Sequence, residues 1–190
     1  MWRMGRTRED ELLPGEWACL GILYSGPAHG FAIAARLKPE GDVGRVWSLS
    51  RALTYRSLEQ LGIRGFVRAV AKEPGIAGGN RTILAATRTG RAQLRTWLAT
   101  PVAHPRDLRS DLLLKLVIAD LCEIDVSEML QMQRQRIVET CAALEAQVAL
   151  DPDDVVALWR TESTNAAVRF LDRLTEPRHR GSSRVRAARR

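Results

Sequence analysis

Long apolar runs, cysteine and lysine are all scarce in this chain of 190 residues. No uninterrupted apolar run approaches the roughly 18 residues that a membrane-spanning helix needs, and residues 1–17 lack the apolar core of a signal peptide. Charged residues make up 27% of the chain and hydrophobic residues 45%, as in ordinary soluble globular proteins, which argues against a largely disordered chain. We therefore expect a folded cytoplasmic protein.

The three cysteines, Cys19, Cys122 and Cys141, are odd in number, far apart in the sequence and set among apolar neighbours. This pattern is typical of small buried side chains, and it does not favour a disulfide or a metal site. The three histidines are equally dispersed, and the sequence has neither a phosphate-binding glycine loop nor a Gly-x-Ser-x-Gly motif. We expect no enzyme activity, no metal and no cofactor.

What the chain does have is a strong segregation of charge. Residues 1–99 carry a net charge of +7, residues 100–177 carry −6 and residues 178–190 carry +6. A basic segment followed by an acidic one is typical of a module that binds a polyanion, joined to a module with a different role.

Residues 16–99 have the pattern of three helices followed by a hairpin. Apolar spacing predicts a first helix at 16–24 and, after the turn at Gly26 and Pro27, a second helix that begins at Gly30. His29 is expected to cap or pack against that second helix, with a phosphate contact as the alternative. The apolar residues that the second helix should bury are Phe31, Ile33, Ala34 and Leu37.

A third helix should follow Ser48 or Ser50, either of which suits the N-cap position. Its expected core face consists of Leu53, Ser57, Leu58 and Leu61. Its other face is polar and is basic in its first half, and consists of Arg51, Ala52, Tyr55, Arg56, Glu59 and Gln60. This face could be simply solvated, but its position near a helix N-terminus favours contact with a polyanion.

Residues 66–85 alternate as two strands around a glycine-rich turn. Three helices followed by a two-stranded ribbon is the order of a winged helix-turn-helix, which places one helix in the major groove of DNA. The candidate DNA-contacting residues are Phe31, Ser50, Arg51, Ala52, Tyr55, Arg56, Lys72 and Arg81. Arginine can pair with guanine O6 and N7, whereas residues beside the hairpin tip are expected to reach the DNA backbone.

From Thr87 onward the pattern is helical. A helix capped by Thr87 should end before Pro101, another should start at Pro105, and a long helix should run from residue 127 to residue 150. We expect Asp151 to cap a last helix that buries Val155, Leu158, Trp159, Ala166, Phe170, Leu171 and Leu174. The long helix, about 36 Å in length, has a coiled-coil-like seam that needs a partner, so a homodimer is expected. The predicted dimerisation residues are Leu130, Ile137, Cys141, Leu144, Val148, Trp159 and Phe170.

These patterns divide the chain into four parts. We expect a mainly helical protein with an N-terminal arm at 1–15, a winged helix-turn-helix domain at 16–99, a helical dimerisation domain at 100–176 and a disordered basic tail at 177–190.

Three stretches resemble the PadR family of bacterial transcriptional regulators: LGILYSGPAHGFAIAARL, WSLSRALTYRSLEQLGIRGFV and RTILAATRTGRAQL. The resemblance covers residues 16 to about 98. The residues that match the family's motifs are Gly26, Pro27, His29, Gly30 and Phe31 in the turn, Tyr55, Leu58 and Leu61 in the third helix, and Thr87, Gly90 and Arg91 after the hairpin. The chain departs from the family at Arg51, where a proline is usual, and at Phe31, which lacks the hydroxyl of the usual tyrosine.

The resemblance implies a nucleoid-associated homodimer, most often a repressor, that binds a pseudo-palindromic DNA operator. It also implies a pocket between protomers for a small planar aromatic effector, for which Trp97 and Trp159 are candidates, although packing in a core or a dimer would also explain both tryptophans. The alternative function is a winged-helix adaptor that binds protein or RNA in place of duplex DNA.

Overall fold

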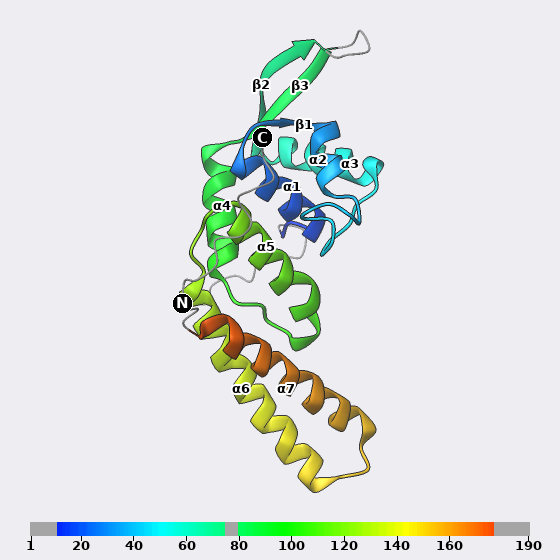
Figure 1. Ribbon diagram of the computed structural model, residues 1–190, viewed down its shortest axis with the longest axis vertical. Coiled ribbons are helices and arrows are strands. Elements are labelled where there is room, and N and C mark those ends of the chain that lie inside the picture. The colour runs from blue at the N-terminus through cyan, green and yellow to red at the C-terminus, as the bar shows by residue number, and fades with distance from the viewer. Residues whose placement is uncertain (1–10, 75–79, 177–190) are drawn as a thin grey trace, which may run out of the picture. The chain divides into compact units, whose positions relative to one another are not determined.

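The computed structural model describes residues 11–74 and 80–176, and its elements fall into two compact units that divide between Met129 and Leu130 (Figure 1). The first unit holds α1 (Pro14–Ser25), β1 (Ala28–His29), α2 (Gly30–Arg36), α3 (Arg51–Ile63), β2 (Val67–Pro74), β3 (Asn80–Ala86), α4 (Arg88–Ala99) and α5 (Leu113–Leu121). The long helix α6 (Ser127–Leu150) begins just before the division, and α7 (Val155–Thr175) follows it. The prediction of a mainly helical protein with a β-hairpin after three helices is confirmed. Most of the predicted N-terminal arm, the tip of the hairpin and the predicted basic tail lie outside the described residues.

Helix α1 is the centre of the first unit, because α3, α4 and α5 all pack against it. Pro14 occupies its first position, where a missing N–H costs nothing, and the Glu16 carboxylate accepts a hydrogen bond of 2.8 Å from the Leu13 N–H. Its residues from Trp17 to Leu23 are all buried, so the helix is apolar on every side, as expected for a helix enclosed by others.

A short strand that the sequence did not reveal joins the helices to the hairpin. In β1, Ala28 pairs with Leu84 and His29 pairs with Ile83, which gives an antiparallel sheet in the order β1-β3-β2. His29 Nδ1 also accepts a hydrogen bond of 3.0 Å from the Ala32 N–H and caps α2, so the capping role predicted for His29 is confirmed. This one residue therefore belongs to the sheet and fixes the start of the helix beside it.

Two residues that we assigned to the core are exposed. Phe31 is 57% exposed and Leu53 is 49% exposed, while Thr54 is fully buried. The buried face of α3 is therefore turned by one residue, to Thr54, Leu58 and Leu61. Burial of the Thr54 hydroxyl is tolerated because it donates a hydrogen bond of 3.0 Å to the Ser50 carbonyl.

The two ends of the hairpin are joined at Thr87. Its N–H donates to the Phe66 carbonyl at 2.9 Å and its hydroxyl donates to the Gly65 carbonyl at 2.8 Å, while the same hydroxyl accepts from the Gly90 N–H at 3.1 Å. Thr87 is thus the N-cap of α4, as predicted, and it also closes the base of the hairpin.

The first unit extends beyond residue 99, where we placed a domain boundary, because α5 packs against α1. Between α4 and α5 the chain forms a 3₁₀ turn at Pro105–Asp107 and a π-helical turn at Leu108–Leu112. The helical pattern expected after Pro105 is therefore present, but its first turns are irregular.

In the second unit, α6 and α7 lie side by side as an antiparallel pair (Figure 1). Arg134 forms an ion pair with Asp172, and the Cys141 thiol lies 3.0 Å from the Asn165 amide oxygen. Ile137 and Cys141, on the same face of α6, are buried. Part of the seam that we expected to need a second chain is thus covered by α7 of the same chain.

Helix α7 differs from the prediction at its start and in its buried face. Its N-cap is Asp154, which accepts from two backbone N–H groups, and Asp151 lies in the preceding turn. The residues it buries are Ala157, Thr161, Thr164 and Leu171. Five of the residues that we expected this helix to bury are exposed instead: Val155, Leu158, Trp159, Ala166 and Phe170.

None of the helices in the described ranges has both the length and the apolar character that crossing a membrane would require.

Candidate nucleic-acid interface

The candidate interface is the exposed face of α3 together with the start of α2 and the hairpin. Ser50 caps α3 by accepting a hydrogen bond of 3.2 Å from the Leu53 N–H. The four predicted contact residues in the first two turns of α3, Arg51, Ala52, Tyr55 and Arg56, are all exposed. The structure therefore leaves this part of the helix free to meet a ligand.

Arg51 lies between two aromatic rings. Its guanidinium carbon is 5.7 Å from the centroid of Phe31, on α2, and 5.7 Å from the centroid of Tyr55, one turn along α3. Such cation–π contacts restrict a side chain that otherwise has many rotamers. Exposed Phe31 is explained by this contact, because the ring positions Arg51 and does not belong to the core.

Gly30 permits this arrangement. A Cβ on Gly30 would come within 2.8 Å of Tyr55 Cε1, tighter than real Cβ contacts allow. With any other residue at position 30, the Tyr55 ring would have to move away from the turn that precedes α2.

A cleft of about 660 Å³ separates these residues from the hairpin. Arg51 and Tyr55 line one side of it, and Asn80, Arg81 and Thr82 of β3 line the other. Lys72 is exposed and lies outside the cleft, opposite Thr82 in the register of the sheet. The structure thus brings Arg81 together with Arg51 but sets Lys72 apart from both.

The basic residues of the interface have acids nearby, since Glu59 lines the same cleft and Glu73 lies opposite Arg81 in the sheet, but no ion pair within the described ranges joins them. Among the described residues the ion pairs join Arg36 to Asp42, Arg106 to Asp107 and Arg134 to Asp172. The basic residues of the interface take part in none of these pairs. Their charge is available to an external anion.

The sequence did not single out Asn80 and Thr82, which line the cleft on either side of Arg81. It also missed Leu53, which is exposed on α3 next to the predicted contact residues. The Asn and Thr carry no pattern that would distinguish them from other polar residues of a hairpin.

The two tryptophans proposed for an effector pocket lie in different units. Trp97 stacks on Trp17 with a centroid distance of 4.6 Å, and the Lys115 ammonium lies 4.0 Å from the Trp97 centroid. Both faces of the Trp97 ring are therefore occupied within the chain. Trp159, on α7, is 73% exposed.

The predicted dimerisation residues are divided between buried and exposed positions. Leu130, Ile137 and Cys141 are buried in the single chain, and Leu144 and Val148 are half-buried. Trp159 and Phe170 are exposed and lie on one face of α7, with Val155 on the same face. This exposed apolar stripe of α7 is the part of the predicted set that remains available to a partner.

No protein-family model and no curated protein matches this sequence. Among solved structures, the chain is similar to PadR of Bacillus subtilis, which was crystallised in complex with operator DNA, with 18% identity over 84% of this chain and 97% of that one, at a TM-score of 0.44. It is also similar to smu.1604c from Streptococcus mutans UA159, with 16% identity over 85% and 98% of the two chains, at a TM-score of 0.43. A third match is the PadR-like transcriptional regulator BC1756 from Bacillus cereus, with 20% identity over 90% and 98%, at a TM-score of 0.40.

Proposed function

We propose that this protein is a non-enzymatic transcriptional regulator of the PadR type, which binds duplex DNA in the cytoplasm through α3 and the hairpin. The observation that carries the proposal is Arg51, exposed at the start of α3 and restricted by Phe31 and Tyr55. The first turns of a recognition helix meet base edges in the major groove, and an arginine there can bind guanine O6 and N7 together. The motifs shared with the PadR family support the same function.

Phosphate contacts would supply the rest of the affinity. Arg56, Lys72 and Arg81 form none of the ion pairs among the described residues. Arg56 follows Arg51 on α3 and Arg81 shares its cleft, whereas Lys72 lies outside the cleft on β2. Contacts of this kind position a protein on the duplex without reading its sequence. Residues 100–177 are acidic, so they would not be attracted to the DNA backbone.

We propose further that the protein acts as a homodimer on a pseudo-palindromic operator, and that it represses transcription, as the family resemblance implies. The exposed apolar stripe of α7, with Val155, Trp159 and Phe170, supports a contact with a second copy. Two recognition helices related by a two-fold axis would read half-sites about 34 Å apart.

Replacing Arg51 by alanine is expected to weaken binding of the preferred operator by about 1 to 3 kcal/mol, because the bidentate contact to one base is lost. The mutant should lose its preference at one base pair of each half-site. Operators that differ only at that base pair should therefore bind the mutant with equal affinity. Titrations of duplexes obtained by selection from a random pool, followed by fluorescence anisotropy, would measure this effect.

A matched control is Arg136→Ala, because Arg136 is an exposed arginine on α6, outside the interface. Operator affinity should not change in this variant. Unchanged affinity in Arg51→Ala as well would remove α3 from the mechanism, and tighter binding of single-stranded RNA than of duplex DNA would favour the adaptor function.

Replacing Trp159 by aspartate is expected to convert the dimer into monomers at micromolar concentration, because a charge would enter the apolar contact between copies. Analytical ultracentrifugation would show the mass fall by half. The conservative variant Trp159→Phe should remain dimeric. A monomeric mass for the unmodified protein would contradict the proposed dimer and leave the contact of α3 with DNA untouched.

A further inference from the structure

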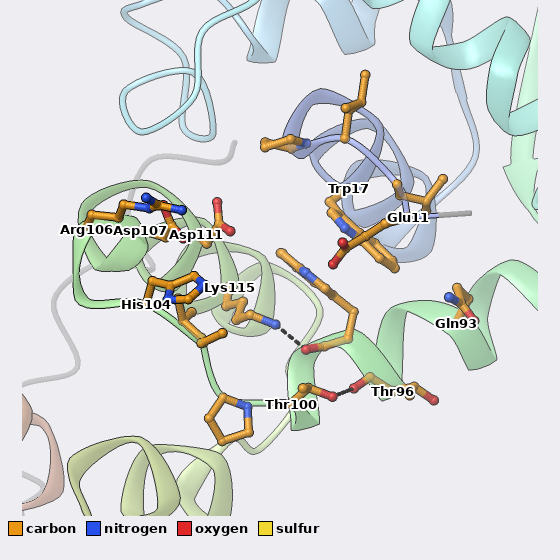
Figure 2. Close-up of a pocket in the computed structure, with 17 residues that line it drawn as sticks. Glu11, Trp17, Gln93, Thr96, Thr100, His104, Arg106, Asp107, Asp111 and Lys115 are labelled. Atoms are coloured by element: carbon orange, nitrogen blue, oxygen red, sulfur yellow. Dashed lines mark hydrogen bonds and ion pairs between the residues drawn. The ribbon is translucent and has the colours of Figure 1, made fainter. Parts of the chain in front are cut away.

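The first unit contains a second cavity, of about 560 Å³, on residues that the proposed DNA contact does not use (Figure 2). The start of α1, the second half of α4 and residues 101–115 surround it. Its volume lies within the range of small-molecule sites in proteins. No residue of α3 or of the hairpin lines it.

Lys115 of α5 points into this cavity, as Figure 2 shows, although the residue is only 3% exposed. Its ammonium donates a hydrogen bond to the Trp97 carbonyl, which is the one acceptor that the described residues provide. An ammonium has three donors, and burying it with most of them unused is costly. The arrangement therefore leaves room for a further acceptor from a ligand, such as a carboxylate.

Negative groups line the same cavity. Asp111 and Glu11 both face it, and both lie close enough to Lys115 to favour its charged form. Asp111 is half-buried, and its pKa is raised by this burial and by the nearby Asp107. The Asp107 carboxylate oxygen Oδ1 lies 3.7 Å from Arg106 Nε, so the negative charge of Asp107 is partly balanced. For Asp111, the Ser110 side chain and the Lys115 charge favour the ionised form, but burial and Asp107 outweigh them.

The backbone that carries Asp111 is unusual. Residues Leu108–Leu112 form a π-helical turn directly before α5. Such turns are rare and occur often at functional sites, because they shift a side chain out of the regular helical position. Here the turn places Asp111 at the cavity, four residues before Lys115.

One part of the remaining wall is apolar, whereas Gln93, Thr96, Thr100 and His104 make another part of it polar. Trp17 and Trp97 stack against each other, and both line the cavity together with Leu12. Since both faces of Trp97 are occupied, a ligand would meet the edges of the rings and the aliphatic side chains. The apolar part of the wall favours a small apolar group over a polar one.

The combination of charges selects among ligands. A simple anion would bind Lys115 but would be repelled by Asp111 and Glu11. A simple cation would bind the two carboxylates but would be repelled by Lys115. A molecule with both an acid and an amine satisfies both sides. We propose that this cavity binds a zwitterionic small molecule of the α-amino acid class, with its carboxylate at Lys115, its ammonium at Asp111 and Glu11, and an apolar side chain against Trp17 and Leu12.

Two sets of probes test the proposal on the full chain by isothermal titration calorimetry. Each set holds an amino acid, the acid without the amine and the amine without the acid: L-leucine with 4-methylpentanoate and 3-methylbutylamine, and L-phenylalanine with 3-phenylpropionate and 2-phenylethylamine. We expect at least one amino acid to bind about tenfold or more tighter than both of its counterparts, which corresponds to loss of one charged contact. Equal affinities within both sets, or no binding of either amino acid at millimolar concentration, would overturn the proposal.

Variants locate the site. Lys115→Met should weaken binding of the amino acid about tenfold or more and leave the corresponding amine unaffected or bound more tightly. Asp111→Asn should weaken binding of the amine and leave the corresponding acid unaffected or bound more tightly. Asp111 is half-buried, so its variant should fold even if Lys115→Met does not, and circular dichroism would check both. Arg51→Ala should bind all six probes normally, so the site and the proposed DNA contact can fail independently. Unchanged affinities in both cavity variants would place the binding elsewhere.

Discussion

Replacing Gly90 by alanine is expected to lower the free energy of unfolding by about 3 kcal/mol. A Cβ at this position would overlap the carbonyl oxygen of Phe66, which is backbone and cannot rotate away. That oxygen accepts the hydrogen bond from the Thr87 N–H that closes the base of the hairpin. The substitution would therefore separate α4 from the hairpin and also disrupt the hydrogen bonds that hold the two ends of the hairpin together. Chemical denaturation followed by circular dichroism would measure the loss.

Gly62 provides the control for this experiment. It lies near the end of α3, and a Cβ there would meet nothing within 4 Å. Gly62→Ala should leave stability unchanged or raise it by about 1 kcal/mol, because alanine is the better helix former. Equal stability of the two variants would show that the contact between Gly90 and Phe66 does not restrict this position.

Raising the pH from about 7 to about 11 is expected to stabilise the protein by about 3 kcal/mol relative to its Lys115→Met variant. Burial lowers the pKa of the Lys115 ammonium from 10.5 to about 8, although Asp111 and Glu11 oppose the shift. Below pH 8 the amine is protonated in both the folded and the unfolded chain, so folding must bury a charge and the penalty is complete. As the pH rises through 8, the folded protein loses the proton first, and the penalty disappears near the pKa of the unfolded chain.

The comparison with Lys115→Met is needed because other groups titrate in the same range. Burial raises the pKa of the Cys19 thiol to about 12 and that of Cys122 to about 11, and both effects reduce stability at high pH in either protein. These contributions cancel in the difference between the two proteins. A difference in unfolding free energy that stays constant between pH 7 and pH 11 would mean that the Lys115 ammonium is not buried as the structure describes.

Local features of the first unit could be predicted from the sequence. Ser50 and Thr87 cap their helices as expected, because an N-cap depends on residues within one turn of the chain. The hairpin could be predicted from its alternation and its glycines. The π-helical turn and the two-residue strand β1 could not, since neither is long enough to show a period.

Faces of helices were harder to assign, because they depend on partners far away in the sequence. Leu53 and Thr54 are adjacent, and only the packing of α3 against α1 and α2 decides which of them is buried. On α7 the apolar stripe was recognised, but α6 packs against the small residues of the opposite face. The cavity around Lys115 brings together segments that are distant in sequence, so it could not be predicted from the spacing of residues.

The double role of His29 has a consequence for the shape of the DNA in the proposed complex. Because His29 pairs with Ile83 in the sheet and also caps α2, the start of α2 is tied to β3 of the hairpin. A DNA-binding surface tied together in this way would adjust less to grooves of different width. Where the groove does not fit the protein surface, the duplex would have to bend or untwist. Base steps that kink easily would then be preferred in the operator, even at positions that no side chain contacts.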